Sequence, residues 1–277
     1  MTYDPAEIAA HFDRLGAGEW DRFDRTLGDR VSLALHSRVL EQFIPRASRV
    51  LEIGAGPGRF TEQLHHLGCR VTVGDLSAAQ LKLNEETART RGFAASVTGW
   101  HQMDICDLGR FPDCGFDAVV AFGGPLSYVF ERRDDALREC LRVLRPGGVL
   151  LLSVMSVWGT LHRHLAGVLT LPVEANRSIV TTGDLTSEND PGSTHHCHMF
   201  RAAELRGFLE RFGLELLWLS ASSAITTGVE PGVLTDERKW DMVLDFEMMA
   251  CTEAGYLDAG THLIAAARHL NVRAAHG

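Results

Sequence analysis

Three glycines separated by single residues form the strongest chemical signal in this chain. Gly54, Gly56 and Gly58 stand between the apolar run 50–53 and a helical pattern, with Ala55 after the first of them. Glycine allows the chain to turn sharply at such a point and lets the backbone approach a ligand closely. A tight turn that binds nothing could use the same residues, so the turn alone does not define a site.

The spacing of these glycines distinguishes between two kinds of ligand. A dinucleotide-binding turn carries its third glycine at the sixth position, where Arg59 stands here. Glu52 lies two residues before the first glycine, and its negative charge would repel a pyrophosphate. A carboxylate at this position suits a ligand with a positive charge, such as the amino group of a methionine moiety.

Acidic residues follow the next two predicted strands. Asp75 comes after the run 70–73 and can accept hydrogen bonds from both hydroxyls of a ribose, although it could also simply begin the helix that Ser77 caps. Asp104 follows the third strand and could accept a hydrogen bond from an adenine amino group. Apolar residues that could hold the adenine ring are Leu76 and Ile105.

Taken in order, these motifs resemble the class I S-adenosylmethionine-dependent methyltransferases, and most of all their small-molecule branch. The resemblance rests on Glu52 with the glycine turn, on Asp75 and Asp104, and on the segments 116–120 (Phe-Asp-Ala-Val-Val) and 141–148 (Leu-Arg-Val-Leu-Arg-Pro-Gly-Gly). It covers about residues 40–154 and, more loosely, 200–267. Each motif is weak by itself, whereas five in order are specific.

The resemblance implies S-adenosyl-L-methionine as the cofactor. It implies that the glycine turn packs against this cofactor with Glu52 nearby, that Asp75 binds the ribose and that Asp104 binds the adenine. Phe122 and Gly123 would line the site near the methyl group. The chain lacks the Asn/Asp-Pro-Pro-aromatic sequence of amino-methylating enzymes after its fourth strand, and it lacks a Pro-Cys nucleophile dipeptide.

Methyl transfer from a sulfonium needs alignment of the reacting atoms, and it needs a general base only when the acceptor arrives protonated. The candidate bases are His36, His196 and His198. Trp20 and Tyr128 are the aromatic candidates for holding the acceptor. Each of these five residues could instead have a structural role in the core or at the surface. No carboxylate is expected beside the histidines of 195–198, and no metal site is predicted.

The elements that must position these residues form an α/β fold. Helical patterns occupy the first 45 residues, and from residue 49 short apolar runs alternate with helices, which predicts a doubly wound, mostly parallel sheet of the Rossmann-like kind. The resemblance implies seven strands with an antiparallel last strand. We expect an N-terminal helical cap (1–45) and a methyltransferase domain (46–277) with an inserted lid (155–200). Within the lid, a helix over 157–171 and a hairpin with arms 179–182 and 196–200 are predicted.

The composition of the chain limits the kinds of partner that we expect it to bind. The 277 residues carry a net charge of −9 without a basic run, which disfavours a nucleic-acid partner. The longest apolar stretch, 148–158, is too short to cross a membrane, and six cysteines without a CxxC pair fit a cytoplasmic protein. The stripe of apolar residues in 240–248 could belong to the core, to the acceptor site or to a homodimer contact.

The sequence therefore predicts transfer of a methyl group to an oxygen, nitrogen or carbon nucleophile of a small organic molecule. A non-methylating reaction on the same fold is the first alternative, because nothing in the motifs requires methyl transfer. A nicotinamide-dependent oxidoreductase is a second, disfavoured by Glu52 and by the early third glycine. A binding or regulatory protein without turnover is a third.

Overall fold

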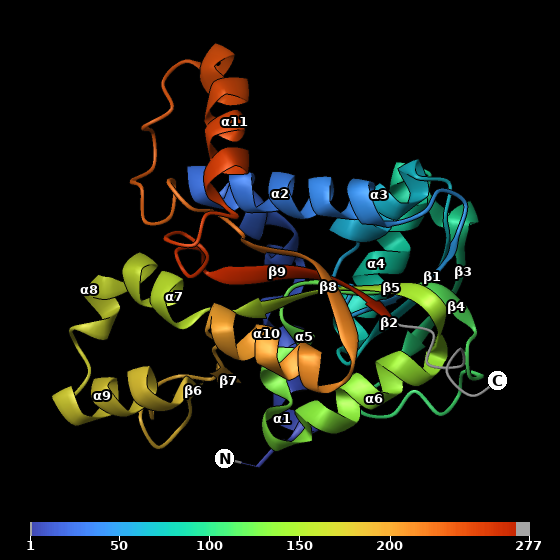
Figure 1. Ribbon diagram of the computed structural model, residues 1–277, viewed down its shortest axis with the longest axis horizontal. Helices are drawn as coiled ribbons and strands as arrows, with labels where there is room; N and C mark the ends of the chain where they lie inside the picture. Colours follow the sequence, from blue (N-terminus) through green and yellow to red (C-terminus); the bar gives the residue numbers. More distant parts are fainter. Residues whose placement is uncertain (1, 270–277) are drawn as a thin grey trace.

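A seven-stranded sheet with the order β3-β2-β1-β4-β5-β9-β8 forms the centre of the computed structural model, which describes residues 2–269 (Figure 1). All neighbouring strands are parallel except β9, which is antiparallel to both β5 and β8. The predicted sheet and its antiparallel last strand are confirmed. The strands are β1 (Arg49–Ile53), β2 (Arg70–Asp75), β3 (Val97–Gln102), β4 (Phe116–Ala121), β5 (Leu144–Met155), β8 (Leu214–Ala221) and β9 (His262–His269).

Helices cover both faces of the sheet, and each face has its own apolar core. Successive residues of β1 alternate between the two cores: Val50 points to one and Leu51 to the other. This burial on both sides explains why the strands are nearly continuous apolar runs. The core that contains Val50 is covered by α2 (Leu27–Phe43), α3 (Arg59–His66), α4 (Ala78–Arg91) and α11 (Trp240–Ala250). The core that contains Leu51 is covered by α5 (Pro125–Tyr128), α6 (Arg133–Val143) and α10 (Ala202–Arg211). Short 3-10 turns are η2 (Ala94–Ser96), η3 (Phe130–Arg132) and η4 (Glu237–Lys239).

The N-terminal segment begins with α1 (Pro5–Leu15), continues as the 3-10 helix η1 (Gly16–Asp24) and then enters α2. Residues 16–24, within the stretch predicted to be helical, therefore form a tighter 3-10 helix rather than an α-helix. Polar contacts tie α1 to α4: the side-chain amide of Gln80 donates to the carbonyls of Phe12 (3.0 Å) and Gly16 (2.9 Å). These contacts hold the N-terminal segment against the carboxyl ends of β1, β2 and β4.

The inserted segment after β5 differs from its prediction. Residues 157–171 form two short helices, α7 (Val157–Arg163) and α8 (Leu165–Val168). Residues 179–182 are the last turn of α9 (Val173–Thr182) and not a hairpin arm, so that prediction was wrong. The hairpin instead pairs β6 (Asp184–Leu185) with β7 (Cys197–His198). The β-branched run Ile-Val-Thr-Thr favours a strand locally, but Ile179 packs into a tertiary cluster as part of a helix that ends at the left-handed Gly183.

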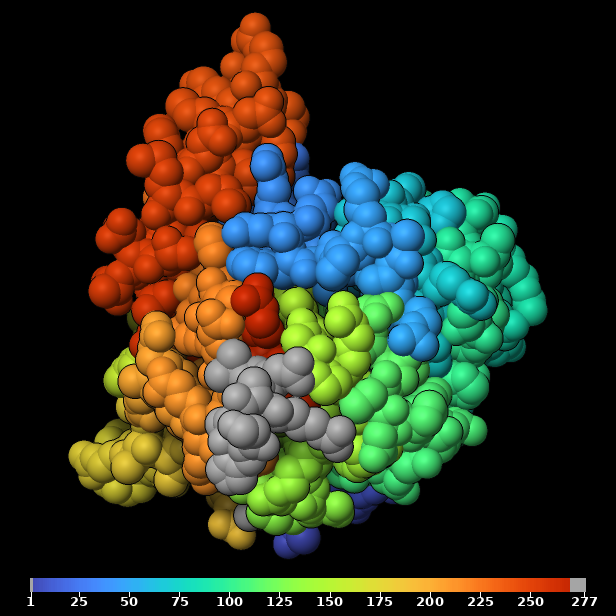
Figure 2. Space-filling model, turned by 45° about the vertical axis from the view of Figure 1, so that its right-hand side comes forward, coloured from blue at the N-terminus to red at the C-terminus, as the bar shows by residue number. Residues whose placement is uncertain are grey.

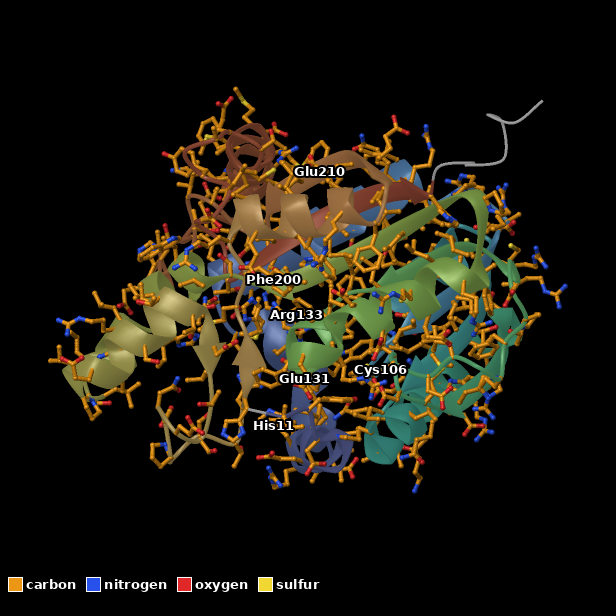
Figure 3. All side chains as sticks on the ribbon, turned by 60° about the horizontal axis from the view of Figure 1, so that its bottom comes forward. His11, Cys106, Glu131, Arg133, Phe200 and Glu210 are labelled. Carbon is orange, nitrogen blue, oxygen red and sulfur yellow. The ribbon has the colours of Figure 1, made fainter. Side chains whose placement is uncertain are left out.

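The inserted segment rejoins the domain at Phe200, which is fully buried beside α6. The guanidinium carbon of Arg133 lies 5.4 Å from the centre of the Phe200 ring (Figure 3). The main-chain N–H of Phe200 donates to the carbonyl of Met155 at the end of β5 (2.7 Å). Both ends of the segment are thus fixed next to the same strand end.

Helix α11 and the loop before it project from the body of the molecule (Figure 2). Glu247 is completely buried and anchors the helix, because its carboxylate accepts the main-chain N–H groups of Ala224, Ile225 and Thr226. Three large apolar side chains on this helix are about half or more exposed: Met242, Phe246 and Met249. Within residues 2–269, no helix is long and apolar enough to cross a membrane.

Candidate cofactor and acceptor sites

The glycine turn is built into the sheet by main-chain hydrogen bonds. The N–H groups of Gly54 and Ala55 both donate to the carbonyl of Gly74 in β2 (2.9 and 3.2 Å). Gly54 and Gly56 have positive φ angles of 67° and 53°. A Cβ added to Gly54 would lie 2.5 Å from Cγ of Pro125, whereas one added to Gly56 would meet nothing nearer than 3.9 Å. Gly54 is therefore required by packing, and the open side of Gly56 faces a cavity.

This first cavity, of about 80 Å³, lies at the carboxyl ends of β1, β2 and β4. Ligands of doubly wound α/β sheets bind at this edge. The N-terminal segment covers it, contributing Phe12 from α1 and Arg22 from η1. Predicted site residues in its lining are Gly54, Gly56, Asp75, Leu76, Asp104, Ile105, Gly123 and Tyr128.

Asp75 lies at the end of β2 and is 7% exposed. Its carboxylate accepts the main-chain N–H of Gly56 (2.8 Å) with one oxygen and that of Ser77 (2.8 Å) with the other. Burial raises the pKa of Asp75 to about 6, although these two hydrogen bonds oppose the shift. Because a carboxylate offers about four acceptor positions, Asp75 can still accept hydrogen bonds from ligand hydroxyls.

Glu52 lies behind the glycine turn and is not part of the cavity wall. Its carboxylate accepts a hydrogen bond from Thr61 (2.7 Å), and Asn84 donates both to that Thr61 hydroxyl (3.0 Å) and to the carbonyl of Gly56 (3.1 Å). Burial raises the pKa of Glu52 to about 8. Glu52 therefore supports the turn from inside the protein, whereas the sequence placed it beside the ligand.

The far side of the first cavity is flat and apolar, with Asp104 at its edge. Asp104 accepts the main-chain N–H of Cys106 (2.8 Å). Met103 crosses over Gly74, where a Cβ would overlap the Met103 side chain. This contact explains why a glycine, Gly74, stands directly before Asp75. Sequence reasoning missed Met103 because its role depends on the neighbouring strand. Tyr3 also lines this end, and burial together with the charge of Asp104 raises its pKa.

A second cavity, of about 290 Å³, opens beyond Gly123. Gly123 and Arg22 belong to the linings of both cavities, so the two meet at the end of β4. The sequence predicted the position of Gly123 but gave no sign of Arg22, whose role depends on how η1 folds over the sheet. Histidines lining the second cavity are His36, His164, His195 and His262.

His36 is the predicted base that lies in this cavity. It is 3% exposed, and its Nδ1–H donates to the carbonyl of Ser32 (2.7 Å). This hydrogen bond leaves Nε2, which has no hydrogen-bond partner within residues 2–269, as an acceptor. Burial lowers the pKa of His36 to about 4 and that of His262 further below its usual value, so both rings are neutral at pH 7.

Tyr128 lines the first cavity and His195 lines the second, and the two side chains meet where the cavities join. The Tyr128 hydroxyl and Nε2 of His195 are 2.8 Å apart. Burial raises the pKa of Tyr128 and lowers that of His195 to about 4, so the phenol donates and the imidazole accepts. The ring of His195 also stacks on His11 of α1, with their centres 5.1 Å apart. The sequence singled out the histidines on either side of Cys197 and passed over His195.

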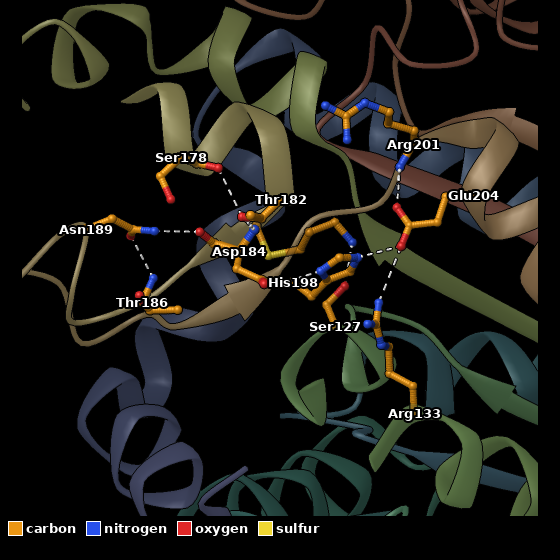
Figure 4. A network of polar contacts seen from close by, with 11 residues as sticks. Ser127, Arg133, Ser178, Thr182, Asp184, Thr186, Asn189, His198, Arg201 and Glu204 are labelled. Carbon is orange, nitrogen blue, oxygen red and sulfur yellow. Dashed lines mark hydrogen bonds and ion pairs between the residues drawn. The ribbon is translucent and has the colours of Figure 1, made fainter. Parts of the chain in front are cut away.

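The remaining predicted residues lie outside the two cavity linings. Nδ1 of His196 is 3.1 Å from the carboxylate of Glu7. His198 is held between the carboxylates of Asp184 (2.6 Å) and Glu204 (2.8 Å), as Figure 4 shows. Each histidine thus has a carboxylate partner, contrary to the sequence-based expectation. No group of three or more His, Cys, Asp or Glu residues placed to hold a metal occurs within the described part of the chain.

Two aromatic residues also differ from their expected surroundings. The ring of Trp20 is covered by the guanidinium of Arg59 at 4.3 Å, away from both cavity linings. Phe122 packs its ring against His36 (4.8 Å between centres) and Phe60 (5.1 Å). Phe122 and Ala55 line a small hollow between the glycine turn and η1. Phe122 thus contacts the base candidate directly.

A doubly wound α/β fold with a cavity at the carboxyl ends of its parallel strands is typical of nucleotide-binding enzymes. Comparison with known proteins shows which family the chain resembles. Residues 51–152 match the family model described as methyltransferase domain. The ubiquinone/menaquinone biosynthesis C-methyltransferase UbiE of Azotobacter vinelandii is 38% identical over 140 residues, which cover 47% of this chain and 53% of that protein. Methyltransferase GfsG of Streptomyces halstedii is 29% identical over 75% of this chain and 66% of its own. The chain thus spans about half the length of the first of these relatives.

Solved structures agree with the fold. The Burkholderia thailandensis 1,6-didemethyltoxoflavin-N1-methyltransferase, determined with S-adenosylhomocysteine, superposes with a TM-score of 0.59 over 96% of this chain and 88% of its own, at 16% identity. The [4+2]-cyclase SpnF gives 0.55 over 86% and 80%, at 20% identity. The methyltransferase-domain match over residues 51–152 and the similarity to UbiE support the class I S-adenosylmethionine-dependent methyltransferase family that the motifs predicted, and the solved structures share its fold.

Proposed function

We propose that the protein transfers the methyl group of S-adenosyl-L-methionine to an oxygen, nitrogen or carbon nucleophile of a small organic molecule. The observation that carries this proposal is the meeting of the two cavities at Gly123. A cofactor in the first cavity would supply an activated methyl group, and an acceptor in the second would approach it from the opposite side. In-line displacement requires this arrangement of nucleophile, methyl and sulfur.

The first cavity has features that fit this cofactor. The open side of Gly56 leaves room for a ligand against the backbone, and Asp75 offers free acceptor positions for ribose hydroxyls. Leu76, Met103 and Ile105 provide apolar surfaces for an adenine, with Asp104 beside them to accept from its amino group. We assign an indirect role to Glu52, which holds Thr61 and through it the glycine turn. Further members of the proposed binding turn and its support are Gly54, Ala55, Gly58 and Phe122.

We assign His36 the role of orienting the acceptor. Its neutral Nε2 can accept a hydrogen bond from an acceptor O–H or N–H group. A pKa of about 4 makes His36 a weak base at pH 7, so the proposed acceptor is intrinsically nucleophilic or acidic. Tyr128 would hold the acceptor through its contact with His195.

His196 and His198 remain proposed participants, and the carboxylates beside them favour positioning over contact with the substrate. Trp20 likewise remains a proposed substrate contact, acting through Arg59 and η1. The N-terminal segment (1–45) and the inserted segment (155–200) are proposed to act as cap and lid, because both line the second cavity.

The remaining proposals concern the setting of the protein. Six free cysteines, of which five are buried, support a reducing, cytoplasmic location. The net charge of −9 argues against nucleic acid or an anionic membrane surface as a partner. The exposed apolar face of α11 supports a homodimer, which light scattering on the purified full chain would test.

A labelled-methyl assay tests the proposed reaction. The full chain is incubated with methyl-labelled S-adenosyl-L-methionine and a panel of small phenols, amines and carboxylic acids. We expect label in one class of product, with one S-adenosylhomocysteine released per methyl transferred. Conversion of an acceptor without transfer of label would favour the non-methylating alternative. Binding of NADH with no binding of S-adenosylhomocysteine would favour an oxidoreductase.

A further inference from the structure

The second cavity does not end at the histidines that line it. It continues into a third cavity of about 410 Å³, since both are lined by Met155, Thr160, His164 and His195. The walls of the third cavity come mainly from the inserted segment, in particular α7, α8, α9 and β6. A continuous space therefore runs from Gly123, where the methyl group would lie, into the interior of the inserted segment.

The two parts of this space differ in chemistry. Ionisable side chains line the second cavity: besides its histidines it presents the cations Arg22, Arg25 and Arg163 and the single acid Asp29. Arg163 is paired with Asp29 (3.1 Å), and Arg22 with Glu19 (2.6 Å). The third cavity is mainly aliphatic, with walls that include Val157, Leu161, Val168, Leu171, Ile179 and Leu185.

Aliphatic side chains that surround an open space lose the dispersion contacts that a packed interior provides. The inserted segment does not pack these residues together: α7 and α8 are separated by a break at His164, and both helices line the cavity with α9. Its size is enough for an aliphatic chain or a ring system of drug-like dimensions. The segment is therefore built to surround an apolar ligand rather than to form a filled core.

We propose that the methyl acceptor is an amphipathic molecule. Its nucleophilic hydroxyl or amine lies in the second cavity beside His36 and His262, and an extended aliphatic body occupies the apolar cavity between α7, α8 and α9. The neutral imidazoles accept hydrogen bonds from the nucleophilic end, and the apolar walls supply most of the affinity. This inference rests on the proposed function, because it places the nucleophile at the junction with the cofactor cavity.

A series of 4-alkylphenols with ethyl, butyl and hexyl chains tests the proposal by isothermal titration of the full chain with saturating S-adenosylhomocysteine. Each methylene that enters an apolar cavity contributes about 0.8 kcal/mol at most, which corresponds to roughly a fourfold change in affinity. We expect the dissociation constant to fall about two- to fourfold per methylene, at one phenol per chain. No dependence on chain length would overturn the proposal.

Two variants localise the binding. Leu161→Glu places a carboxylate in the apolar wall, and Leu169→Glu makes the same change at a neighbouring position that is 74% exposed and outside that wall. We expect Leu161→Glu to abolish the chain-length dependence and Leu169→Glu to retain it. Val168→Glu on α8 provides a second wall variant if Leu161→Glu fails to fold. Equal behaviour of wall and control variants would contradict the proposal.

Titration with S-adenosylhomocysteine alone distinguishes a failure of the amphipathic-acceptor proposal from a failure of the proposed methyl transfer. If it binds normally while the phenols show no chain-length dependence, the amphipathic acceptor is refuted and the proposed methyl transfer stands. If it does not bind, while phenols without it bind with the expected dependence and Leu161→Glu removes that dependence, the apolar cavity is supported and methyl transfer is refuted.

Discussion

Replacing Asp75 by asparagine tests the assignment of the cofactor cavity. The carboxylate accepts two main-chain N–H groups and, in our proposal, a ribose hydroxyl as well. Asparagine has one oxygen and one NH₂ group, so it can accept from Gly56 or from Ser77 but not from both, and it lacks the charge that strengthens a ligand hydrogen bond. A hydrogen bond to a charged group contributes about 1.5–3 kcal/mol. The affinity for S-adenosylhomocysteine should therefore fall roughly 10- to 150-fold.

Stability should change much less than affinity, because two effects of similar size oppose each other. One main-chain N–H left without a partner costs about 1–3 kcal/mol. Burial raises the pKa of Asp75 from 3.8 to about 6, so ionising it is about 3 kcal/mol more costly in the folded chain, and asparagine removes this cost at pH 7. We expect the melting temperatures of variant and wild type to lie within a few degrees.

The assay is isothermal titration with S-adenosylhomocysteine at pH 7.5, with thermal unfolding measured on the same samples. Asp117→Asn is the matched control, since Asp117 also accepts a main-chain N–H, from Arg49 (2.8 Å), but lies outside the cavity lining. We expect the control to bind S-adenosylhomocysteine as the wild type does. Unchanged affinity in a folded Asp75→Asn protein would refute the ribose role.

Four further substitutions have defined outcomes. Burial raises the pKa of Glu52 from 4.5 to about 8, so between these values the folded chain keeps a proton that the unfolded chain loses. The free energy of unfolding should therefore decrease as the pH rises from 5 to 8. Glu52→Gln should flatten this decrease, which is on the order of 4 kcal/mol, in urea unfolding; an identical slope would contradict the burial argument. The lowered pKa of His36, about 4, should make stability fall as pH drops from 6.5 towards 4, and His36→Asn should weaken that loss in acid titrations followed by circular dichroism. Gly54→Ala should lower the melting temperature more than Gly56→Ala, since both positions have positive φ but only the first Cβ overlaps Pro125. Gly56→Ala should instead weaken S-adenosylhomocysteine binding at least tenfold, and calorimetry that shows tight binding would place the cofactor elsewhere.

The sheet and the glycine turn could be predicted because their determinants are local. The strand around Val50 is apolar on both faces, and Gly54 and Gly56 occupy positions that require positive φ. Asp75 is the last residue of β2 and Asp104 lies two residues after β3, so the parallel sheet brings them to one edge. These features depend on residues close together in the sequence.

The acceptor side could not be predicted in the same way, because its contacts join distant segments. Tyr128 meets His195 across 67 residues, and Arg22 reaches the junction only because η1 folds over the strand ends. The strand prediction for 179–182 failed for a related reason, since the packing of Ile179 overrides its local preference. Nothing in the sequence distinguishes His195, which lines a cavity, from its neighbour His196, which lies beside Glu7.

A crystal structure of the full chain with S-adenosylhomocysteine tests the central claim most directly. We expect the ribose at Asp75, the adenine beside Asp104 and Ile105, and the sulfur next to Gly123, facing the histidine-lined cavity. Occupation of the second cavity by S-adenosylhomocysteine, or a sulfur atom turned away from Gly123, would contradict the claim that the two cavities hold cofactor and acceptor on either side of the transferred methyl group.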